Sequence, residues 1–88
     1  MATHELKTDS DVFEAVFDGF KQYEIRFNDR DFQVDDELIL RETVSTGKQM
    51  AEGALLRYTG REYRCIVHYI LRGPIYGLMD GWVVLSIS

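Results

Sequence analysis

The stretch Gly19-Phe20-Lys21-Gln22-Tyr23-Glu24-Ile25-Arg26 holds the change from helical to strand periodicity that decides the fold. Before the stretch, and at its second position, apolar residues recur at helical spacing, at Val12, Phe13, Val16, Phe17 and Phe20. From Gln22 the period becomes two, and Tyr23, Ile25 and Phe27 alternate with polar residues. We therefore expect a core-packed helix that ends near Gly19, followed by a strand whose apolar side faces the core.

The rest of the chain predicts mainly strands. They are expected at residues 4–7, 37–42, 55–58, 62–71 and 82–87. Turns are expected at 28–31, 35–36 and 59–61, the last of which joins a hairpin, and exposed loops at 43–53 and 73–81. One N-terminal helix and about five to six strands predict a single α+β domain over residues 1–88. Its small, curved antiparallel sheet is expected to close into a barrel, which limits exposed edges.

Composition narrows the classes of function. The net charge of −5 argues against sequence-independent binding to a duplex, because that mode depends on Lys and Arg neutralising phosphates. A pocket for one base or nucleotide stays compatible with it. Cys65 is the only cysteine, so we expect no intramolecular disulfide and no thiolate-rich zinc site.

The sequence contains no recognisable targeting signal for export or for a membrane. Its start lacks a signal-peptide pattern, and no apolar run approaches the ~20 residues that a membrane helix needs. We therefore expect a cytoplasmic protein with no membrane partner, no metal and no cofactor.

The opening stretch also fits the pattern Gly-x-Lys-x-x-Glu-x-Arg, between an apolar helix and a strand. In that context it resembles the signature of the ASCH domains, relatives of the PUA RNA-binding fold. Nearly the whole chain resembles a family of small bacterial and phage ASCH-like proteins without an assigned function, through residues 4–7, 24–32, 38–42, 58–61 and 76–78. The resemblance implies a PUA-like barrel and RNA-related work, but it does not fix a substrate.

The charged residues of the stretch are the main candidates for a binding site. On strand geometry Glu24 and Arg26 share one face, opposite the expected core face, and Lys21 could lean over the same place. In a pocket, Glu24 would accept from the N–H edge of a base, Arg26 would grip a carbonyl or phosphate, and Lys21 would supply a mobile positive charge. The alternative is an ion pair on the solvent side of a strand.

Three other residues enter the candidate list. Tyr76 and Trp82, in and beside the glycine-rich loop, are candidates for an aromatic platform, with core or rim packing as the alternative. His4 is a further binding candidate, whereas His68 on its strand is expected to be structural or exposed. The two histidines lack the spacing and the additional ligands of a metal site.

Three functions are compatible with these residues. The first is a module that binds RNA or a nucleotide through Lys21, Glu24 and Arg26. The second, implied by the ASCH resemblance, is a small amidohydrolase that acts on acylated cytidine, with Lys21 as its catalytic residue. No hydroxyl nucleophile matches that activity here, so we do not expect an enzyme. The third is a phage or bacterial regulator that binds another protein.

Overall fold

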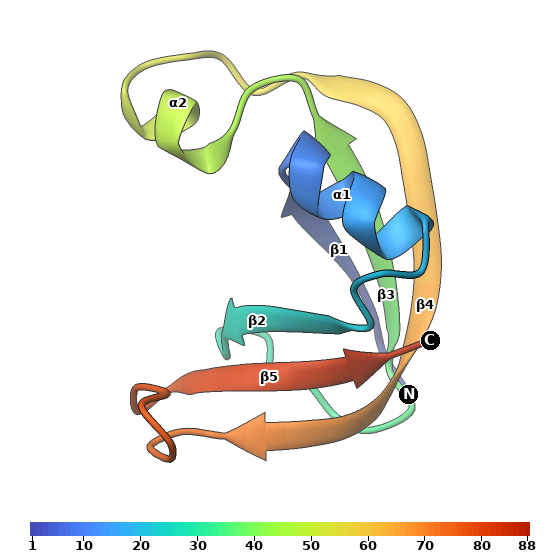
Figure 1. The fold of residues 1–88 in the computed structure, drawn as a ribbon, viewed down its shortest axis with the longest axis vertical. Helices are drawn as coiled ribbons and strands as arrows, with labels where there is room; N and C mark the ends of the chain where they lie inside the picture. The colour runs from blue at the N-terminus through green and yellow to red at the C-terminus, as the bar shows by residue number, and fades with distance from the viewer.

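The computed structural model describes residues 1–88 as one five-stranded sheet with two helices (Figure 1). The elements are β1 (Thr3–Thr8), α1 (Ser10–Phe17), β2 (Tyr23–Phe27), β3 (Glu37–Thr43), α2 (Gly47–Ala51), β4 (Tyr58–Arg72) and β5 (Trp82–Ile87). The strand order is β1-β3-β4-β5-β2. The chain is thus a small, mostly β domain with five strands. The antiparallel prediction is wrong for one pair: β1 and β3 are parallel, because the chain crosses α1 and β2 between them.

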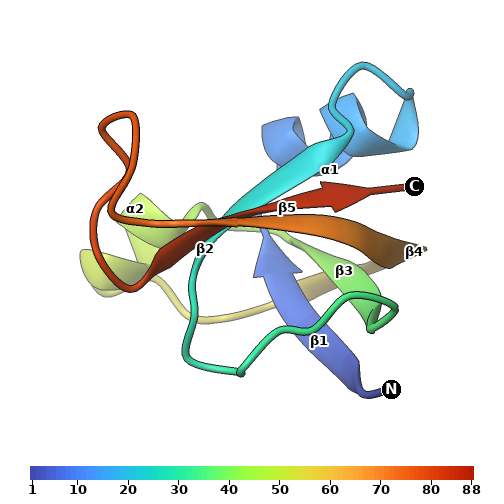
Figure 2. The same ribbon diagram turned by 90° about the horizontal axis from the view of Figure 1, so that it is seen from below.

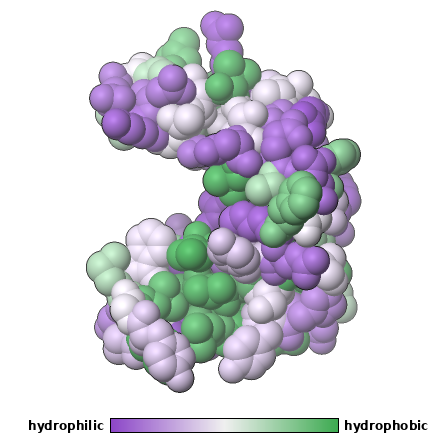
Figure 3. All heavy atoms as spheres, in the orientation of Figure 1, coloured by the Kyte–Doolittle hydropathy of each residue, from purple (hydrophilic) through white to green (hydrophobic).

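The sheet is strongly curved, and β4 makes the bend. Its first half pairs with β3 and its second half with β5, with a register shift between Val67 and Tyr69. Consequently β2 and β5 run across the direction of β1 and β3 (Figures 1 and 2). The predicted closure is not observed: β1 and β2 are free edges that share no strand pairing. A space-filling view shows the molecule hollowed on this side, between α2 and β2 (Figure 3).

A core of eleven buried side chains fills the bend. Phe13 and Val16 reach it from α1, and Phe32, with no exposed surface, reaches it from the segment before β3. The apolar run of β3 is buried on both faces, as the sequence predicts. Two predicted core residues lie outside: Phe17, the last residue of α1, is half exposed, and Phe20, which comes after the end of the helix and after Gly19, is almost fully exposed.

The prediction for β2 has the two faces reversed. Tyr23, Ile25 and Phe27 are about half exposed, whereas Glu24 retains only 2% of its surface. The register explains this result, since Glu24 pairs with the core residue Leu85. Cross-strand partners share a face of the sheet. The charged side of β2 therefore faces inward and its apolar side faces solvent.

The predicted turn at 59–61 is instead part of β4. Gly60 adopts a φ of +95° where the β3–β4 register shifts, so the chain forms an irregularity in the ladder rather than a hairpin turn. The buried Glu42 carboxylate accepts hydrogen bonds there from the hydroxyls of Thr59 and Ser10, each at 2.8 Å. These two bonds lower the pKa of Glu42 despite its burial. A buried acid therefore ties α1 to β3 and β4.

The predicted loop at 43–53 contains the short helix α2. Thr46 caps its N-terminus, and Gln49 returns a side-chain hydrogen bond to the Thr46 backbone, which completes a capping box. The glycine-punctuated loop at 73–81 and the last strand match the sequence prediction. Neither helix has the length and apolar character to cross a membrane.

Candidate nucleotide-binding cleft

Lys21, Glu24 and Arg26 form one ion cluster at the inward side of β2. Lys21 Nζ lies 2.7 Å from Glu24 Oε1, and Arg26 Nη2 lies 3.1 Å from Oε2. The Glu24 side chain is 3% exposed, whereas those of Lys21 and Arg26 are 17% and 25% exposed. Two cations therefore surround one buried carboxylate, and the cluster presents one excess positive charge to solvent.

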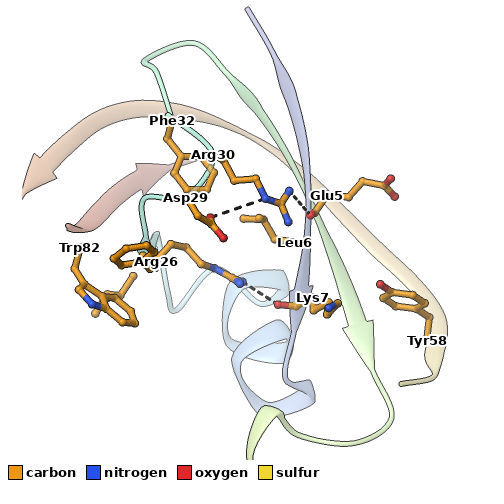
Figure 4. A pocket seen from close by; sticks show the side chains of 11 residues that line it. Glu5, Leu6, Lys7, Arg26, Asp29, Arg30, Phe32, Tyr58 and Trp82 are labelled. Carbon is orange, nitrogen blue, oxygen red and sulfur yellow. Dashed lines mark hydrogen bonds and ion pairs between the residues drawn. The ribbon is translucent and has the colours of Figure 1, made fainter. Parts of the chain in front are cut away.

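The cations of this region also cap the two free edges of the sheet. Arg26 Nη2 donates to the carbonyl of Lys7, and Arg30 Nη1 donates to the carbonyl of Glu5, both at 3.0 Å on β1 (Figure 4). Lys21 Nζ donates to the carbonyl of Tyr23 on β2. Unpaired carbonyls at a sheet edge can pair with a strand of another molecule, and charged side chains at the edge block such pairing. Long cationic side chains thus join edges that the sheet leaves apart.

A cleft of about 550 Å³ lies between these edges. Charged residues of β1 and of the segment after β2 line it together with apolar and aromatic ones: Glu5, Leu6, Lys7, Ile25, Arg26, Phe27, Asp29, Arg30, Phe32, Tyr58 and Trp82. A second hollow of about 340 Å³ adjoins it, and Lys7, Ile25 and Arg26 line both. The ion cluster opens into this second hollow through Lys21 and Glu24.

Comparison with protein families places the whole fold in one family. A profile described as "Domain of unknown function (DUF3850)" matches residues 3–87. The chain belongs to this family. No curated protein matches the chain. All five strands and both helices lie within the matched residues, so the cleft is built by the DUF3850 domain itself.

Glu24 of this DUF3850 chain is already paired with the two neighbouring cations. Its two oxygens face Lys21 and Arg26, and it has almost no exposed surface. Both of its oxygens therefore hold the two cations in place, and its role toward a base stays a prediction. Lys21 and Arg26 keep exposed surface and further donor capacity, so both can still reach an anion.

The two candidate aromatic residues, Trp82 and Tyr76, lie in different parts of the molecule. Trp82 lines the cleft, where its ring packs edge-to-face on Phe27 with the ring centroids 5.9 Å apart. Tyr76 is 90% exposed in the loop between β4 and β5, and it lines neither the cleft nor the second hollow. Of these two candidates, only Trp82 therefore lines the cleft of the DUF3850 domain.

His4 lies apart from the ion cluster. Its Nε2 is 2.8 Å from Asp36 Oδ2, and its ring packs edge-on against Phe32. These contacts give it a structural role at the start of β1. His68 is exposed and its ring contacts the hydroxyl of Ser88. No group of three or more His, Cys, Asp or Glu side chains converges as a metal site would require.

Two cationic side chains of the cleft, Lys7 and Arg30, were not predicted to belong to the site. Lys7 belongs to a predicted strand and Arg30 to a predicted turn, and no local pattern links either to the Lys21 stretch. Cys65 offers no alternative chemistry, because burial raises the pKa of its thiol to about 11, with a smaller contribution from the Glu24 charge. The lining of the cleft of the DUF3850 domain thus combines cationic and aromatic side chains.

Proposed function

We propose that the DUF3850 cleft binds a nucleotide or a short single-stranded stretch of RNA, in keeping with the ASCH resemblance and with a PUA-like origin of the open, curled sheet. The observation that carries the proposal is the excess positive charge of the Lys21–Glu24–Arg26 cluster beside the ring of Trp82, in a chain whose net charge is −5. A positive site that persists against an acidic background suits one phosphate and one base better than a long duplex.

The phosphate and the base of a nucleotide each have a counterpart in the cleft. Lys7 and Arg26, which line both hollows, supply donors for a phosphate. Trp82 and Phe27 supply a wall on which a base can stack, and stacking accepts any base because each has a π-face. Ligand orientation follows: phosphate toward the ion cluster and base toward β5.

Lys21 gives no support to the amidohydrolase alternative. Its ammonium donates to the Glu24 carboxylate and to the Tyr23 carbonyl, so it acts as a fixed cation in this geometry. Nucleophilic or base catalysis by lysine requires a free amine.

Trp82 supplies a direct test, since it is the only tryptophan. We expect nucleotides and short single-stranded RNA to change its fluorescence with saturation. Lys7→Ala should weaken binding about fivefold, the effect of one partly exposed charge contact of about 1 kcal/mol. Lys7 has no ion-pair partner, so the substitution should leave stability unchanged.

Lys48→Ala is the matched control. Lys48 is exposed on α2 and lines neither hollow, so this variant removes the same charge and should bind like the parent chain. An equal loss in the two variants would reveal a general charge effect and no site. If Trp82 fluorescence does not change with any member of a panel of nucleosides, nucleotides and single-stranded oligomers, the proposal is wrong.

A further inference from the structure

The outward side of the second half of the sheet is an unpartnered apolar surface. It consists of Tyr23, Ile25 and Phe27 of β2, Trp82 and Val84 of β5, and Tyr69 of β4, which we call the outer face. The registers place these side chains together: Ile25 pairs with Val84, Phe27 with Trp82, and Ser86 stands between Tyr23 and Tyr69. Figure 3 shows apolar side chains gathered over β2 and β5 on this side.

This surface is too apolar to be an ordinary solvent face. Tyr23, Ile25, Phe27 and Tyr69 are 44%, 50%, 53% and 61% exposed. No outward position of the paired segments of β2, β5 and β4 is charged, although 28% of the chain is charged. Aromatic enrichment with depletion of charge is the composition of an interface core. An antiparallel sheet that faces water would instead alternate apolar and polar residues across its two faces.

We propose that the outer face packs against the outer face of a second copy of this chain. Two identical copies related by a twofold axis make the commonest oligomer, in which one patch covers itself. Two apolar sheet faces pack about 10 Å apart with interdigitated side chains. An uncharged face can meet its own copy without burying a charge, although each chain carries a net charge of −5.

The size of the outer face suits a weak dimer. Half-exposed aromatic side chains present on the order of 100 Å² each, so the face offers roughly 500 Å² per copy. Two copies would bury about 1,000 Å² in total, the lower limit of a specific interface. We therefore expect dissociation on the order of tens of micromolar, since an interface of this size has few hot-spot residues to add.

The outer face has no charged side chain of its own, although Lys21 Nζ lies 4.7 Å from the centre of the Tyr23 ring at its edge. Ile25, Phe27 and Trp82 belong both to the outer face and to the lining of the cleft, so a dimer should compete with a ligand that stacks on Phe27 and Trp82. Salt should act in opposite directions on the two processes. It should strengthen the dimer by screening the repulsion between two acidic chains, and it should weaken phosphate binding in the cleft.

Sedimentation velocity across about 1 µM to about 1 mM protein tests the dimer. We expect a concentration-dependent shift from monomer to dimer that high salt promotes. Tyr69→Lys should keep the chain monomeric over this range, because it places a charge in the middle of the interface. Tyr69 lies outside the cleft, so this monomeric variant should bind a nucleotide at least as well as the parent chain, whose dimer would cover Phe27 and Trp82.

Tyr76→Lys is the matched control, since Tyr76 is 90% exposed and lies in the loop beyond the outer face. It should dimerise like the parent chain, and both variants should retain the far-UV circular dichroism of the parent. A parent chain that stays monomeric at the highest concentration and salt would overturn the proposal and leave a different apolar protein as the occupant. Equal dimerisation of Tyr69→Lys and the parent would overturn it as well.

Discussion

Replacing Glu24 with alanine should lower the free energy of unfolding by about 3 kcal/mol, because it leaves two cations beside the core without their carboxylate. Glu24 is 2% exposed and receives hydrogen bonds from Lys21 and Arg26 at 2.7 to 3.2 Å. The cost falls at the lower end of the range for broken buried pairs, since both cations keep some contact with solvent. Urea unfolding followed by Trp82 fluorescence measures it.

Two further variants define what that loss means. Glu52→Ala removes an exposed carboxylate that has no ion-pair partner and should change stability by less than about 0.5 kcal/mol. The triple variant Lys21→Met, Glu24→Leu, Arg26→Met should recover most of the loss, because an apolar replacement of a whole buried ion cluster is often neutral. If Glu24→Ala proves as mild as Glu52→Ala, the cluster is a screened surface pair and holds no cation in place.

Most of the element order could be predicted from sequence because it depends on local chemistry, but α2 was expected to be loop, and the strands expected at 55–58 and 62–71 are replaced by the single strand β4 from Tyr58 to Arg72. Gly19 adopts the positive φ expected just beyond the end of the helix, and Trp82 begins the last strand as the spacing indicates. The bend in β4 was not predictable in the same way. Gly60 has the same turn-forming character in a hairpin and in a strand irregularity, and the pairing of β3 with β4 across the chain decides between them.

The orientation of β2 shows where periodicity stops being informative. Alternation at Tyr23, Ile25 and Phe27 predicts a strand with two unlike faces, but the core side depends on the partner strand. Pairing of Glu24 with Leu85, 61 positions later in the chain, turned the charged side inward. The usual rule that apolar residues lie inside failed here, and such local failures tend to mark functional surfaces.

The candidate site, too, was only partly predictable from sequence. Lys21, Glu24 and Arg26 meet because they lie within six positions on one turn and strand, which the sequence motif indicated. Lys7 and Arg30 join them only through the approach of the β1 edge to β2, a consequence of the sheet's curvature. No local pattern encodes that approach, so half of the cationic lining depends on tertiary structure.

A third buried carboxylate, besides Glu24 and Glu42, holds the start of the chain in place, where the sequence predicts only a turn. Asp36 is 2% exposed and accepts hydrogen bonds from the Ala2 N–H at 2.9 Å, from His4 Nε2 at 2.8 Å and from the Gln33 N–H at 3.0 Å. Burial by itself would raise the pKa of Asp36. The bonds from Ala2, His4 and Gln33 outweigh burial and hold that pKa below its ordinary value of 3.8. The charged form of Asp36 is therefore the one that stabilises the fold.

The sign of the pH dependence follows from this lowered pKa. The stabilisation by Asp36 should be complete above about pH 5 and should disappear as the pH falls through the folded-state pKa. Asp36→Asn should cost about 2 kcal/mol at pH 7, since it loses charge-assisted bonds, and the difference from the parent chain should shrink below about pH 3. The neighbouring Asp35→Asn is the control, because Asp35 is exposed and asparagine tolerates its φ of +76°. Urea midpoints of the three chains between about pH 2 and about pH 7 decide the matter: a gap between Asp36→Asn and the parent that stays constant down to about pH 2 would show that the hydrogen bonds act without the charge.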